Sequence, residues 1–149
     1  EDQAAYYSAW YYAAVHVLLT IPGFQSKTAI AQRLGLTPKK TGEVLEFLVT
    51  LGLARREQGS FYPGNTQIHL EKDSPLISKH HTNWRMQAIR ALERESGSDL
   101  HYSSVFSLTA ADAARIREAL LMEIQSMVKR VKESKEEKLY TLSLDYYEL

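Results

Sequence analysis

Residues 26–63 read SKTAIAQRLGLTPKKTGEVLEFLVTLGLARREQGSFYP, and this stretch decides the fold. Ser26 is a favourable N-cap for a helix over residues 27–34. Thr37-Pro38 then combines a capping residue with a proline at the first helical position, which predicts a second helix over residues 38–51. Two helices joined by so short a turn are typical of a helix-turn-helix.

A hairpin is predicted directly after the second helix. Residues 53–57 form a short strand candidate, residues 58–60 a turn, and residues 61–63 a returning strand. A two-stranded ribbon in this position is a wing. The sequence therefore predicts a winged helix-turn-helix domain over residues 1–66.

The second half of the chain, residues 67–149, predicts a helix, a strand, a helix and a strand. The first helix spans about 75–95, and residues 100–108 alternate as a strand would. A helix follows Thr109, and residues 139–147 alternate cleanly. We expect this half to be a dimerisation or sensor module, which makes the fold class α+β.

Composition excludes several classes of protein. The chain has 149 residues, 18 Lys and Arg against 18 Asp and Glu, and no cysteine. Disulfide scaffolds, thiolate metal sites and cysteine nucleophiles are therefore excluded. The longest apolar run is too short to span a membrane. The chain begins at Glu1, so we expect a fragment of a longer protein, and we expect it to be cytoplasmic.

No pattern in the sequence predicts catalysis. The adjacent histidines His80 and His81 point in different directions on a helix and make a poor metal pair. Glycine-rich phosphate loops, nucleophile elbows and metalloprotease motifs are missing. We therefore expect a protein that is not an enzyme and that holds no metal and no cofactor.

The winged helix-turn-helix has the residue types that duplex DNA requires. Its second helix must offer polar side chains to the major groove, while flanking cations grip phosphate. The candidates for DNA contact are Arg33, Lys39, Lys40, Thr41, Arg55 and Arg56. Glu43 and Glu46 oppose this role, because carboxylates near phosphate are repelled.

Two resemblances support this interpretation. Residues 45–56, LEFLVTLGLARR, followed by Gly59 and Tyr62, resemble the helix-to-wing signature of small bacterial regulators of the MarR and ArsR type. Residues 6–14 (YYSAWYYAA), 103–109 (SSVFSLT) and 139–144 (LYTLSL) resemble three motifs of an uncharacterised bacterial winged-helix family, a domain of unknown function. Its members are described as candidate transcriptional regulators, and full members have a further N-terminal segment. Here the segment before Thr109 is polar, and Tyr146-Tyr147 replace the family's terminal Phe-Pro.

The sequence leaves three functions open. The leading hypothesis is a regulator that binds double-stranded DNA through helix 38–51 and wing 53–63, as a homodimer. A winged helix that binds a protein partner instead of DNA is the main alternative, favoured by the zero net charge and the two glutamates. The third is a small-molecule sensor that acts on a partner through the second half of the chain.

Overall fold

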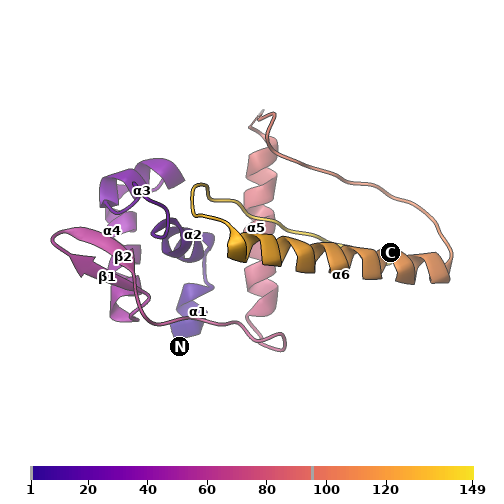
Figure 1. The fold of residues 1–149 in the computed structure, drawn as a ribbon, viewed down its shortest axis with the longest axis horizontal. Helices are drawn as coiled ribbons and strands as arrows, with labels where there is room; N and C mark the ends of the chain where they lie inside the picture. Colours follow the sequence, from indigo (N-terminus) through magenta and orange to yellow (C-terminus); the bar gives the residue numbers. More distant parts are fainter. Residues whose placement is uncertain (1, 95) are drawn as a thin grey trace. The chain divides into compact units, whose positions relative to one another are not determined.

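The computed structural model describes residues 2–94 and 96–149 (Figure 1). Among them are six helices and one antiparallel hairpin, an α+β fold as predicted. The helices are α1 (Asp2–Tyr6), α2 (Trp10–Leu18), α3 (Lys27–Leu34), α4 (Pro38–Thr50), α5 (Ile77–Leu92) and α6 (Ala110–Glu133). The strands are β1 (Ala54–Glu57) and β2 (Ser60–Pro63).

The chain divides into two compact units. The first contains the residues up to 93 together with 136–143, and the second contains residues 94–135 together with 144–149. This division differs from the boundary at residue 66 expected from the sequence. The reason is that α5 packs on the winged part: Asn83 donates from Nδ2 to the carbonyl of Tyr7 at 2.9 Å, and the His80 ring meets the Tyr7 ring edge-on.

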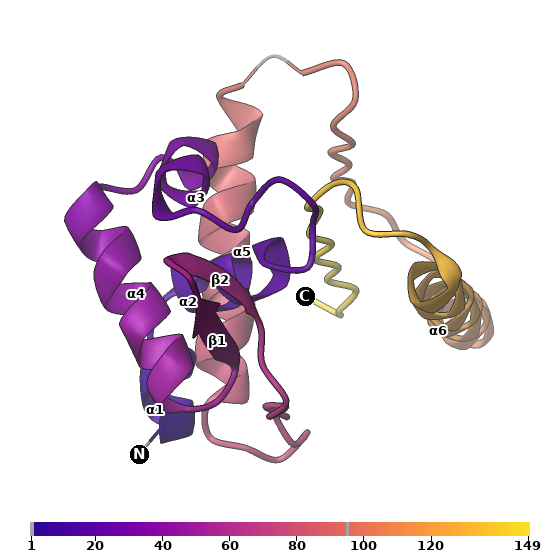
Figure 2. The ribbon, with the colours of Figure 1, turned by 60° about the vertical axis from the view of Figure 1, so that its left-hand side comes forward.

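The core of the first unit lies between α2, α3, α4 and the hairpin, as Figures 1 and 2 show. Branched aliphatic side chains from the three helices and the segments beside them are buried there, with Ala54 and Phe61 of the hairpin. Burial of this kind is the main favourable term in folding. The fully buried members are Val15, Leu18, Leu19, Ile30, Val44, Leu45, Leu48 and Leu53. Because α4 contributes three of them, the packing of its inner face fixes its orientation. The opposite face of α4 lies outside this core.

The hairpin has the predicted position, but its turn is one residue shorter than expected, because β2 begins at Ser60. Arg55 lies opposite Tyr62, and Arg56 lies opposite Phe61. Its turn uses residues with positive φ, Gln58 at 48° and Gly59 at 79°. The helix-turn-helix followed by this hairpin has the order of elements of a winged-helix-like fold.

Two of the predicted strands are wrong. Residues 100–108 and 139–147 run as extended chain, but neither belongs to a sheet among the residues that the structure describes. Alternating polarity indicates only that one face of a segment is suited to partial burial. A β-strand also needs a neighbouring strand that pairs with its backbone N–H and C=O groups. The second half is therefore helix, extended segment, helix, extended segment.

The aromatic stretch near the N-terminus is divided between two helices. α1 ends at Tyr6 and α2 begins at Trp10. Ala9 between them is extended, with φ −151°. The Ser8 hydroxyl donates to the carbonyl of Ala5 at 2.6 Å. Such local bonds compete with helical ones, which explains the break.

Candidate nucleic-acid interface

Three capping interactions set where α3 and α4 begin and end. The Ser26 hydroxyl accepts from the backbone N–H of Ala29 at 3.1 Å, and the Thr37 hydroxyl accepts from that of Lys40 at 3.1 Å. Gly35 closes α3 in the left-handed conformation, φ 64°, which costs glycine little. The contacts of Ser26 and Thr37 confirm the two capping residues predicted from the sequence. They place Lys39 and Lys40 in the first turn of α4.

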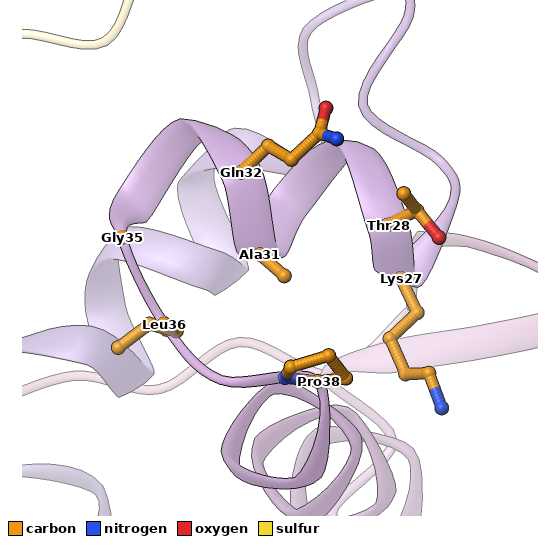
Figure 3. Close-up of a pocket in the computed structure, with 7 residues that line it drawn as sticks. All are labelled: Lys27, Thr28, Ala31, Gln32, Gly35, Leu36 and Pro38. Atoms are coloured by element: carbon orange, nitrogen blue, oxygen red, sulfur yellow. The ribbon is translucent and has the colours of Figure 1, made fainter.

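A hollow of about 390 Å³ separates α3 from the start of α4 (Figure 3). Ala31 and Pro38 lie on opposite sides of it, and the Lys27 side chain extends toward α4. A Cβ added to Gly42 on α4 would lie 3.6 Å from Lys27 Cδ. The Lys27 stem therefore lies against α4 beside position 42, at a distance that leaves room for a methyl group.

Three cations of this region are exposed and form no ion pair with the residues that the structure describes. Two of them, Arg33 and Lys39, were predicted as DNA contacts. The third, Lys27, was missed by sequence reasoning.

The Lys40 ammonium is paired with Glu43, one turn further along α4, at 2.8 Å. The hydrogen bond that the Lys40 ammonium donates to the Glu43 carboxylate raises the pKa of Lys40 and lowers the pKa of Glu43. Lys40 Nζ also lies 5.7 Å from the centre of the Tyr11 ring. Both partners are about half exposed, so water screens the pair and a stronger anion can replace the carboxylate.

The two wing arginines have different surroundings. Arg56 pairs with Glu46 of α4 and stacks over Phe61 with its guanidinium 5.1 Å from the ring centre. Arg55 pairs with Glu57 two residues along the same strand, and its guanidinium lies 4.9 Å from the Tyr62 ring centre. Adjacent residues on a strand point to opposite faces. Arg56 is therefore the wing arginine that joins α4.

Thr41 requires a correction. Its side chain is fully buried, with 0% of its surface exposed. The hydroxyl donates back to the carbonyl of Thr37 at 2.9 Å. Because neither the methyl nor the hydroxyl group reaches the surface, the expected contact between Thr41 and DNA is wrong, and Thr41 is a core residue of α4.

The candidate interface is rich in basic side chains, and ion pairs neutralise half of them. The winged part has six basic residues. Lys40, Arg55 and Arg56 are paired with carboxylates, whereas Lys27, Arg33 and Lys39 form no ion pair within the described part of the chain. Lys39, an unpaired cation in the first turn of α4, suits an anionic partner, since the helix dipole adds partial positive charge there.

The described residues hold no group of three or more metal-ligating side chains that could bind a metal ion. Within residues 2–94 and 96–149, none of the helices combines the length and hydropathy needed to cross a bilayer.

Comparison with known proteins gives one match. No curated protein and no solved structure is similar enough to be matched. A family model does match, over residues 1–149, and its description is a domain of unknown function, DUF4423. Since the match covers the whole chain, the protein belongs to this uncharacterised domain family.

Proposed function

We propose that the protein is a DNA-binding transcriptional regulator that acts as a homodimer in the cytoplasm. In this proposal α4 enters the major groove and the β1–β2 hairpin lies over the neighbouring backbone, the arrangement that winged helix-turn-helix proteins use. The observation that carries it is a set of three exposed cations on the helix-turn-helix, Lys27 and Arg33 on α3 and Lys39 in the first turn of α4, that form no ion pair with the described residues. Phosphate contacts from such residues fix register on a duplex.

The proposal makes a quantitative statement about salt. Each phosphate neutralised contributes about −0.9 to the slope of log K against log salt concentration. The three unpaired cations alone predict a slope of about −3 per protomer. If phosphate also displaces the carboxylates from Lys40, Arg55 and Arg56, the slope approaches −5. The measured slope therefore tells whether the three ion pairs open on binding.

The test is fluorescence anisotropy of a labelled duplex of random sequence, titrated at low salt and then with added NaCl. Lys39→Glu should abolish most of the binding, because it reverses an unpaired charge at the start of α4. Lys79→Glu is the matched control: it makes the same change of charge at an exposed position of α5. Loss of binding in both variants, or absence of binding by the folded wild-type protein at tens of micromolar, would refute the proposal.

The ion pairs themselves favour a second candidate, a winged helix that docks on a protein. Lys40–Glu43 and Arg56–Glu46 place opposite charges side by side on the outer face of α4, which suits a partner with both charge types better than a polyanion. Glu43→Gln discriminates the two functions. For a DNA-binding face it frees Lys40 and removes a repelled carboxylate, so affinity for the random duplex should rise. For a face that binds protein it should create no affinity for DNA.

A further inference from the structure

The second unit has no core of its own. None of its described residues is buried, although it contains the 24-residue helix α6. Apolar side chains nevertheless recur along α6 at three- and four-residue spacing, which places them on one stripe. We define the α6 stripe as Ala113, Ile116, Leu120, Ile124, Met127 and Val131.

The extended segments of this unit continue the same apolar surface. The Tyr146 hydroxyl donates to the carbonyl of Ala113 at 2.9 Å, which holds residues 144–149 against the start of α6. The Phe106 ring stacks on the Tyr146 ring, with the ring centres 6.5 Å apart. Residues 100–108, residues 144–149 and α6 are thereby joined, and both segments leave large apolar side chains in water.

We propose that a second copy of this chain covers this surface, with its α6 antiparallel to the first. The inference deepens the proposed dimeric regulator by naming the surface through which it dimerises. The alternative occupant of the stripe is a different protein. In that case the chain alone would stay monomeric in solution.

The exposed apolar area of this surface is large enough for the interface of a stable dimer. Tyr102, Phe106 and Tyr147 are 84, 53 and 75% exposed. At about 200 Å² for each ring-bearing side chain, they leave about 400 Å² uncovered. A stable interface takes about 800 Å² from each partner. The three aromatic residues supply half of that, and α6 with Leu100 and Val105 can supply the remainder.

The charges on α6 favour a copy that runs in the opposite direction. The first part of the helix, residues 110–123, has three carboxylates and two guanidinium groups, whereas residues 124–133 have three cations and one carboxylate. An antiparallel pair brings the acidic part of one helix beside the basic part of the other, and it also pairs opposite helix dipoles. A two-fold axis makes this contact twice. A parallel pair would place like charges together.

Sedimentation velocity of the full chain in the absence of DNA tests the surface. The wild-type protein should sediment as a particle of twice the 17.0 kDa chain at micromolar concentration. Met127→Glu should weaken dimerisation at least about 100-fold, because each interface would then bury two unpaired carboxylates. Met122→Glu, the same change on the opposite side of α6, should leave the dimer intact. A monomeric wild-type protein, or a dimer in both variants, would overturn the inference.

Disulfide trapping tests the direction without depending on a disruptive variant. The natural chain has no cysteine, so each introduced thiol is unique. Positions 113 and 131 lie near opposite ends of the stripe, about 27 Å apart along the helix. On oxidation, a mixture of Ala113→Cys and Val131→Cys chains should give the mixed disulfide and little of either symmetric one. Dominant symmetric disulfides would indicate a parallel pair and would overturn the antiparallel assignment. Because no DNA is present, neither result bears on whether α4 binds DNA.

Discussion

Replacing Gly64 by alanine should destabilise the first unit by about 3–5 kcal/mol, because the added methyl group would collide with backbone. An ideal Cβ at this position lies 2.0 Å from the carbonyl oxygen of Gly52 and 2.8 Å from the carbonyl carbon of Leu53. Real Cβ contacts essentially never fall below 3.0 Å. The segment that leaves the wing must therefore move away from the turn between α4 and β1.

The magnitude follows from what that movement disrupts. Overpacking a tight site typically costs about 1–3 kcal/mol. Two backbone hydrogen bonds hold the same contact, from the N–H of Gly64 to Leu53 at 2.9 Å and from that of Thr66 to Gly52 at 3.1 Å. Each contributes about 1 kcal/mol when it is lost with the movement. The sum gives the range above.

Gly42→Ala is the matched control, since it adds the same methyl group to the same unit. Position 42 lies inside α4, and the new Cβ would make an ordinary 3.6 Å contact with Lys27 Cδ. Alanine is favoured over glycine in a helix interior by about 0.5–1 kcal/mol. This variant should therefore be slightly more stable than the wild-type protein.

Urea unfolding followed by tryptophan fluorescence measures both variants. Trp10 and Trp84 are the only tryptophans, and both belong to the first unit, so the signal reports the unit that contains the two glycines. A Gly64→Ala protein within about 1 kcal/mol of the wild-type value would refute the close approach of residues 52 and 64. A Gly42→Ala protein as unstable as Gly64→Ala would show that the contact geometry does not control the outcome.

Three further predictions concern the first unit. Leu48→Ala should cost about 3–5 kcal/mol in urea unfolding, because Leu48 is fully buried and its truncation leaves a cavity; a loss below about 1 kcal/mol would contradict this packing. Ser26→Ala should cost about 1 kcal/mol, with Ser78→Ala as a control that removes a hydroxyl without a capping role. His16 lies in a hydrogen bond with the Tyr6 hydroxyl, 2.9 Å from Nδ1, and burial lowers its pKa. The unfolded chain then takes up a proton near pH 6.5 that the folded state resists, so stability should fall as the pH drops below about 6.5 and the drop should be smaller in His16→Asn.

Local chemistry made the helix-turn-helix and the wing predictable. Ser26 and Thr37 act as caps through contacts with residues only three positions away, and Gly35 needs nothing beyond its own backbone conformation. Residues whose structural effect is local can be interpreted from sequence alone. The turn of the hairpin was also predictable, because its conformation depends on the local residues Gln58 and Gly59.

The charges of the candidate site were predictable only in part. Lys40 and Glu43 are three residues apart on one helix, so their pairing follows from helical geometry. The pair Arg56–Glu46 joins the wing to α4, and no spacing rule relates those two positions. Thr41 was misjudged because its place at the start of the helix suggested exposure, whereas the rotation of α4 that buries Val44, Leu45 and Leu48 turns Thr41 inward as well.

The strands expected in the second half failed for a different physical reason. Alternation in residues 139–147 reports side-chain polarity, which the chain retains whether or not a neighbour is present. Hydrogen-bonded pairing depends on what lies beside the segment. The same absence of neighbours leaves Tyr102 and Tyr147 exposed and provides the argument for a second copy.

The two proposals of dimerisation and DNA binding are connected by the number of unpaired cations. Three phosphate contacts give one protomer a shallow salt dependence and only weak non-specific affinity. Two protomers on one duplex double the number of contacts, and the second α4 binds with the effective concentration that its link to the first provides. Met127→Glu should therefore reduce the salt slope of the full chain from about −5 toward −3 while leaving Lys27, Arg33 and Lys39 in place. A slope that stays at the wild-type value in a monomeric variant would show that each winged helix binds DNA independently, and that the second unit dimerises for another purpose.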